Sequence, residues 1–248
     1  MDGLLYVVFG EEYDRLALYT IAHSRRFTNL PICILTNISD RTQKWDSLKN
    51  IIFRYFQLPQ DTNREVKTKM IQYTPFDRTL YLDCDSVIQK PGVEKIFDLV
   101  ENKDILLNLF LCWKKEDKVL QIYKKAMKIG NVDLPLSVYN GAFIAFNKNE
   151  KVSTFFDLWA NYWNLTGRGR EMPSLACAIK NSSVSVLETK WEDNFFAPDK
   201  INEKAIVQHN YNSVSDLNKD FFVDFGLPRI TENKPFDTDP RDWSWVEF

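Results

Sequence analysis

The chain has 248 residues, of which 44% are apolar, so it can bury a substantial core within the length that α/β proteins often use for one domain. Its 32 Lys and Arg residues nearly balance 34 Asp and Glu residues. The resulting net charge of −2 excludes a global electrostatic attraction to nucleic acid or to anionic membranes.

Strands and helices alternate in the first part of the chain. Apolar runs predict strands at residues 4–9, 32–35, 51–56 and 79–82, and helices are predicted at 13–27 and 64–73. This alternation predicts an α/β fold with a mostly parallel central sheet flanked by helices, in which ligands bind beyond the carboxyl ends of the strands. Those ends carry Phe9 and Gly10, Thr36 and Asn37, and Asp83 to Asp85.

Residues 76–90 run an apolar strand directly into Asp83 and Asp85. Alternate side chains of a strand share a face, so both acids are expected to point the same way while Cys84 points into the packing layer. Two desolvated carboxylates side by side are costly without a cation or a proton between them. The pattern therefore favours a metal site, and the alternative is a turn that happens to hold two aspartates.

The second half of the chain is more mixed. We expect apolar strands at 105–111 and 142–146 and amphipathic helices at 116–129 and 152–163. The aromatic stripe of the last helix predicts core packing, and the lysines around the preceding helix predict a solvated face. From residue 216 onward the chain becomes acidic, which suggests a tail. Within it, Asp237 to Asp239 form a second Asp-x-Asp that follows no strand and is interpreted as a turn.

The sequence predicts neither a signal peptide nor a membrane-spanning segment. The N-terminal apolar stretch is too short, and acids come too early, for a signal peptide, and nowhere do ~18 apolar residues run together. We expect a cytoplasmic protein without integral membrane association. The widely spaced cysteines indicate free thiols in a reducing compartment; they are Cys33, Cys84, Cys112 and Cys177.

Five segments resemble the GT-A fold glycosyltransferases, particularly the retaining family 8 type: VVFGEEYDRLALYTIAHSRR, TPFDRTLYLDCDSVI, YNGAFIAFNK, EMPSLACAI and AIVQHNYN. The resemblance implies a Rossmann-like GT-A domain over 1–248. Residues 1–90 would form the nucleotide-binding half, 91–215 the donor-sugar and acceptor half, and 216–248 the tail. It also implies that Asp83 reaches the ribose and the metal, that Asp85 binds the metal, and that His209 completes the site.

His209 is one of only two histidines and follows an apolar run at residues 205–207. An imidazole and two carboxylates make a site suited to Mn²⁺ or Mg²⁺ shared with phosphate oxygens. The alternative for His209 is a surface loop histidine. His23 has no acidic neighbours at helical spacing and is assigned to packing.

Further donor contacts follow from the same resemblance. Lys67 or Lys69 resembles the basic residue near the diphosphate or sugar, with a solvated helix face as the alternative for both. Phe9, Gly10 and Tyr13 match the region that seats the base and ribose. Asn140 and Gly141, after Tyr139, resemble a turn that contacts the donor sugar, although Gly141 also fits a bulge.

Glu171 departs from the family pattern. It stands where the family often has Asp-Gln, and Met172 replaces the polar residue proposed to lie near the anomeric carbon. Glu171 is assigned either to orienting the sugar or to serving as a base in an inverting enzyme. Retention remains the favoured outcome.

The resemblance implies a metal-dependent glycosyltransferase that moves a sugar from a nucleoside-diphosphate sugar, with a UDP-sugar as the expected donor. The acceptor is a glycan, a protein, a lipid-linked sugar or a modified nucleic acid base. One alternative is a non-catalytic nucleotide-sugar or carbohydrate-binding relic. Another is a haloacid dehalogenase-like phosphatase, whose Asp-x-Asp usually lies near the N-terminus. A sugar nucleotidyltransferase would open with a Gly-rich loop that this chain lacks.

Overall fold

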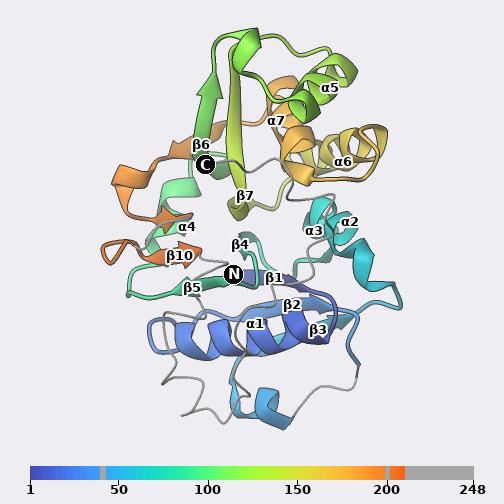
Figure 1. Ribbon diagram of the computed structural model, residues 1–248. Helices are drawn as coiled ribbons and strands as arrows, with labels where there is room; N and C mark the ends of the chain where they lie inside the picture. Colours follow the sequence, from blue (N-terminus) through green and yellow to red (C-terminus); the bar gives the residue numbers. More distant parts are fainter. Residues whose placement is uncertain (40–42, 199–201, 210–248) are drawn as a thin grey trace, which may run out of the picture.

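The computed structural model describes residues 1–39, 43–198 and 202–209, and its centre is a seven-stranded sheet with the strand order β3-β2-β1-β4-β7-β6-β8 (Figure 1). A smaller sheet, with the order β5-β10-β9, lies beside it. The strands are β1 (Asp2–Val8), β2 (Ile32–Thr36), β3 (Ile51–Tyr55), β4 (Arg78–Leu82), β5 (Ser86–Ile88), β6 (Ile105–Trp113), β7 (Leu136–Asn147), β8 (Val186–Thr189), β9 (Phe196–Ala197) and β10 (Val207–His209).

The first half of the chain builds the parallel part of the sheet. β1 pairs in parallel with both β2 and β4, and β2 pairs in parallel with β3. β7 then runs antiparallel to β4 and to β6, and β8 is parallel to β6. The mostly parallel α/β architecture expected from the sequence is therefore confirmed, with the antiparallel strand inserted by the second half of the chain.

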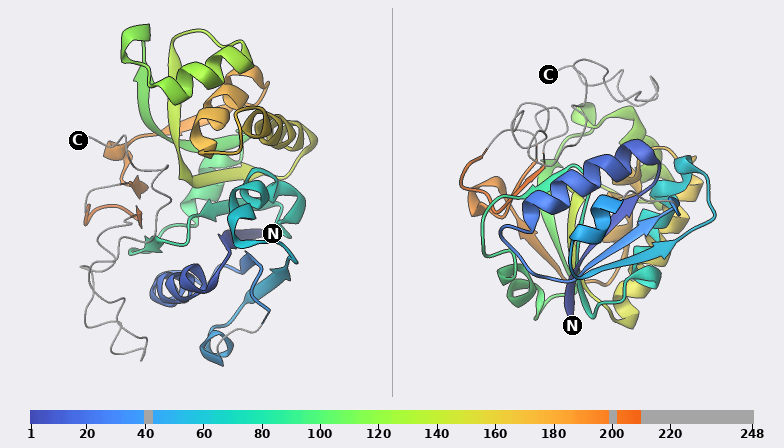
Figure 2. Two further views of the ribbon diagram at one scale, coloured as in Figure 1. Left: turned by 45° about the vertical axis from the view of Figure 1, so that its right-hand side comes forward. Right: turned by 90° about the horizontal axis from the view of Figure 1, so that it is seen from below.

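Helices cover both faces of the sheet (Figure 2). Alternate residues of β1 enter two separate cores, as the pleat of a strand requires: Tyr6 packs with α1 and α4, whereas Val7 packs with α2, α3, α6 and α7. The helices are α1 (Glu11–Ser24), α2 (Asn63–Thr68), α3 (Met70–Tyr73), α4 (Lys95–Val100), α5 (Gln121–Gly130), α6 (Glu150–Leu165) and α7 (Glu171–Asn181).

Two predicted helices are each divided in the structure. The helix predicted at 64–73 becomes α2 and α3, because the backbone of Lys69 leaves the helical region at φ −118°. The helix predicted at 116–129 begins as a 3-10 helix, Glu116–Lys118, and α5 starts only at Gln121. Val119 is buried and extended between them.

The aromatic stripe of α6 is core, as expected. Phe156 and Trp159 are fully buried, and Asn149 caps the helix by accepting a hydrogen bond from the Val152 N–H at 2.9 Å. The four cysteines are free thiols, and only Cys112 is exposed. None of the helices in the described part of the chain combines the length and apolar character needed to cross a bilayer. The expected tail and its Asp237 to Asp239 turn lie outside the described residues.

Candidate functional site

The two acids of the Asp-x-Asp motif lie in the turn between β4 and β5. The Ser86 N–H donates to the Asp83 carbonyl at 2.9 Å, which closes the turn. The strand ends at Leu82, as predicted, so the strand alternation that was used to place both acids on one face does not extend to them. Cys84 is buried in the core that contains α1, as expected. Its carbonyl accepts a hydrogen bond from the Thr20 hydroxyl at 2.9 Å, which fixes the turn to that helix.

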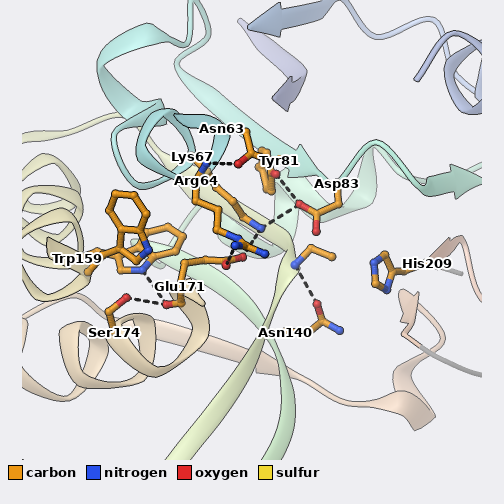
Figure 3. A network of polar contacts seen from close by, with 12 residues as sticks. Asn63, Arg64, Lys67, Tyr81, Asp83, Asn140, Trp159, Glu171, Ser174 and His209 are labelled. Atoms are coloured by element: carbon orange, nitrogen blue, oxygen red, sulfur yellow. Dashed lines mark hydrogen bonds and ion pairs between the residues drawn. The ribbon is translucent and has the colours of Figure 1, made fainter. Parts of the chain in front are cut away.

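Strand pairing brings His209 to this turn. β10 runs antiparallel to β5, and His209 is in register with Ser86. Ligand atoms of Asp83, Asp85 and His209 all lie within 4.8 Å of one another. Figure 3 shows Asp83 and His209 facing the same space from opposite sides. Two segments far apart in the sequence therefore converge on one point.

Asp85 and His209 form a buried pair, with Asp85 Oδ1 at 3.2 Å from His209 Nε2. Burial disfavours the charged form of each residue, but the opposite charge of its partner outweighs this effect. The imidazole lowers the pKa of Asp85, and the carboxylate raises the pKa of His209 to about 9. The pair is thus charged at neutral pH in the absence of a cation.

Both residues have the surroundings of metal ligands. Asp85 Oδ1 is buried, and among the described residues its one polar contact is the ion pair with His209. His209 Nδ1 lies 3.1 Å from the Pro198 carbonyl, which can only accept, so Nδ1 carries a proton and Nε2 faces the acids. A carbonyl on the second ring nitrogen is the usual support of a metal-binding histidine. The donor set of two carboxylates and one imidazole fits Mn²⁺ or Mg²⁺.

Lys67 occupies the space beside Asp83 (Figure 3). Its ammonium lies 3.0 Å from Asp83 Oδ1 and 2.7 Å from Glu171 Oε1, and over the ring of Tyr81 at 5.1 Å. Burial opposes the charge, but the two carboxylates outweigh it and raise the pKa of Lys67. Lys69, the other lysine that the sequence left in question, points elsewhere and pairs with Glu65 at 2.8 Å.

Glu171 lies on the other side of Lys67, at the first position of α7. Arg64 Nε is 3.5 Å from its second oxygen. Burial opposes the carboxylate charge, but Lys67 and Arg64 outweigh it and lower the pKa of Glu171 to about 2. Its carbonyl accepts from Trp159 Nε1 at 3.1 Å and from the Ser174 hydroxyl at 2.7 Å, which fixes the backbone.

Asn140 and Gly141 lie within β7 rather than in a turn. The register with β6 shifts here, so that Asn108 faces Asn140 while Leu107 faces Ile144. This is a bulge, the alternative that the sequence left open for Gly141. A Cβ on Gly141 would lie 3.3 Å from Glu171 Oε1, so the glycine lets the ion pair approach the strand.

The residues after β1 are placed less directly. The Phe9 side chain is buried in the core, which leaves only its backbone for a ligand. The Gly10 N–H donates to Asn37 Oδ1 at 2.9 Å, and its φ of 90° is one that side chains rarely adopt. Tyr13 lies close enough to the turn that Asp85 contributes, after burial and Cys84, to raising its pKa to about 12.

Two residues of this site were missed from the sequence. Tyr81 donates from its hydroxyl to Asp83 Oδ1, and its position two residues before Asp83 on a strand was a usable signal. Arg64 lies three residues before Lys67 on a helix, where the two share a face. Its pairing with Glu171 had no local signal, because α7 begins far along the chain.

Comparison with known proteins gives a match at the level of structure. No family model matches the chain, and no curated protein matches its sequence. Galactosyltransferase LgtC, solved in complex with donor and acceptor sugar analogs, is similar with a TM-score of 0.61 and 13% identity, over 98% of this chain and 92% of that one. Mouse xyloside xylosyltransferase 1 is similar with a TM-score of 0.56 and 12% identity, over 85% and 98%.

GlyE of Streptococcus pneumoniae TIGR4, a glycosyltransferase, is similar with a TM-score of 0.54 and 13% identity, over 84% of this chain and 55% of that one. At identities this low, the structural similarity establishes a shared fold alone. The chain has the GT-A fold that its sequence led us to expect.

Proposed function

We propose that the protein is a metal-dependent glycosyltransferase that moves a sugar, with retention of configuration, from a nucleoside-diphosphate sugar to an acceptor. The observation that carries the proposal is the convergence of Asp83, Asp85 and His209, within 4.8 Å of one another, on a GT-A fold. A UDP-sugar is the expected donor. The structurally similar glycosyltransferases support the reaction class.

Asp83, Asp85 and His209 are the residues that would hold Mn²⁺ or Mg²⁺. When bound, such an ion acts as a Lewis acid and stabilises the negative charge of a diphosphate leaving group. Without a counter-charge, a diphosphate would be repelled by the two carboxylates. Binding of the proposed substrate therefore also requires a divalent cation at this site.

The other site residues suit the two ends of a nucleotide sugar. Gly10, which follows β1, and Tyr13, in the first turn of α1, lie at the carboxyl end of a parallel strand, where nucleotides bind in α/β sheets. Asn140 accepts a hydrogen bond from the Ala142 N–H at 2.8 Å through Oδ1, which leaves its Nδ2 group to donate to a sugar hydroxyl. Lys67 holds a positive charge beside Asp83. Together these residues would bind the base side and the sugar side of the donor around the acids.

The test measures melting temperature with a panel of nucleotide sugars, with and without Mn²⁺. A donor at a hundred times its Kd stabilises the folded state by about 2.7 kcal/mol. For a chain of this size that corresponds to a rise of roughly 5–10 °C. The rise is expected only with Mn²⁺ present, and the same donor should be hydrolysed slowly in the absence of an acceptor.

Asp85→Ala is expected to abolish both the Mn²⁺-dependent rise and hydrolysis. Asp98→Ala, which removes an exposed acid on α4, is the matched control and should keep both. Binding without hydrolysis would support the alternative of a non-catalytic binding protein. Full Mn²⁺-dependent activity of Asp85→Ala would contradict the proposed metal site.

A further inference from the structure

Lys67 is enclosed by the protein. Its side chain is 7% exposed, and its ammonium contacts one oxygen each of Asp83 and Glu171. A buried ammonium is stable only when opposite charges and hydrogen bonds surround it. Two carboxylates provide this here, from the end of β4 and from the start of α7. If Asp83 shares its charge with a cation, Glu171 is the partner that remains for Lys67.

Asp83 depends on Lys67 for its orientation. Its Oδ1 atom accepts from the Tyr81 hydroxyl and from Lys67 at 3.0 Å. With Oδ1 occupied twice, Oδ2 is the oxygen left for another partner. The rotation of the carboxylate is thus set by the two donors, and one of them is held in place by Glu171.

Glu171 itself has no free oxygen. Oε1 is 2.7 Å from Lys67, and Oε2 is 3.5 Å from Arg64. Its backbone carbonyl is fixed by Trp159 and Ser174, so the side chain starts from a rigid point. Gly141 completes the arrangement, because a larger residue at that position would press on both Glu171 and Lys67.

From this geometry we infer that Glu171 is a positioning residue: it holds Lys67, and through Lys67 it fixes the carboxylate of Asp83 for the cation and the donor. This inference rests on the proposed function. It argues against the alternative role of Glu171 as a general base, because a cation beside each carboxylate oxygen stabilises the charged form and makes protonation unfavourable. The low pKa of Glu171 agrees with that conclusion.

The first test is Mn²⁺ binding by isothermal titration calorimetry without any donor. Glu171→Leu removes the acceptor and the charge, and it is expected to raise the Kd for Mn²⁺ by at least about ten-fold, as loss of a supporting residue around metal ligands does. Glu171→Gln keeps an oxygen that accepts from Lys67, so it should restore part of this loss. If Glu171 acted only as a nearby negative charge, both variants would weaken binding equally, and the inference would be wrong.

The second test is the pH profile of donor hydrolysis, measured with the nucleotide sugar found by the melting screen. Glu171→Gln is expected to lower the rate while keeping the shape of the wild-type profile. Loss of an acidic limb in Glu171→Gln would identify Glu171 as a base and overturn the inference. Melting temperatures of both variants, compared with Asp98→Ala, check that the fold is intact.

The outcomes separate this inference from the proposed function. Wild-type protein that binds no Mn²⁺ would refute the proposed metal site and the inference with it. Wild-type protein that binds Mn²⁺, with unchanged binding in both Glu171 variants, would refute the inference alone.

Discussion

Replacing Lys67 with methionine is expected to destabilise the metal-free protein strongly. Methionine fills a similar volume, so the change is mainly electrostatic: Asp83 and Glu171 lose ion-pair partners at 3.0 and 2.7 Å. Removing one member of a buried ion pair costs about 3–5 kcal/mol. Arg64 remains 3.5 Å from Glu171 and the Asp83 side chain is 30% exposed, so we expect the lower end, about 3 kcal/mol.

The assay is urea denaturation at pH 7 in the presence of EDTA, followed by tryptophan fluorescence, with the free energy of unfolding taken by linear extrapolation. Lys69→Met is the matched control from the same segment. Lys69 is 31% exposed and forms a surface ion pair with Glu65, so its loss is expected to cost less than about 1 kcal/mol.

The rate of donor hydrolysis should distinguish the Lys67 variant from the Lys69 variant in the same way. Lys67→Met is expected to lose Mn²⁺-dependent turnover, whereas Lys69→Met is expected to retain it. If the two variants unfold within about 0.5 kcal/mol of each other, the difference lies in the range of ordinary surface substitutions. Lys67 would then not neutralise the two carboxylates, and the reasoning about this network would be refuted.

Two further predictions concern stability away from the site. Burial of Asp104 opposes its charge, but Lys151 and Ser185 outweigh it and lower the pKa of Asp104 from 3.8 to about 2. This shift corresponds to about 2.5 kcal/mol of folding free energy before screening. Solvent screening of this surface pair reduces the contribution to about 1 kcal/mol. Because the pKa of Asp104 is lower in the folded protein, this stability is present above pH 4 and is lost as the pH falls toward 2. Urea titrations should therefore show that Asp104→Asn is less stable than wild type at pH 7 but differs little from it at pH 2. Phe156→Ala is expected to cost about 3–5 kcal/mol of unfolding free energy in the same assay, because the Phe156 side chain is fully buried. Phe110→Ala is the control and should cost far less, because Phe110 is 48% exposed. Equal losses would contradict the assignment of the α6 stripe to the core.

The sequence predicted those parts of the fold that depend on local pattern. β1 and β2 read as unbroken apolar runs because they are buried on both faces, as parallel strands between two helical layers are. Asp83 and Asp85 stood out because charge followed such a run at once. β9 was not predicted, because two residues carry no periodicity.

The choice between Lys67 and Lys69 was beyond the sequence. Two residues apart on a helix, the two side chains point to different sides, and the local residues do not indicate which side faces the acids. The partner of Lys67, Glu171, is 104 residues away, and only the packing of α7 against β7 and α6 brings it near. Long-range ion pairs of this kind are set by tertiary packing, on which local propensity gives no information.

The antiparallel contact between β5 and β10 has a consequence for synthesis of the chain. His209 reaches the acids only when β10 has paired with β5. During translation, the nascent polypeptide can therefore fold the parallel strands of its first half while the third proposed ligand is still unmade. A ribosome must add almost the whole described length before the proposed cation site has all three of its residues. Chains released early, before residue 207, are expected to lack high-affinity Mn²⁺ binding even where their first strands have folded.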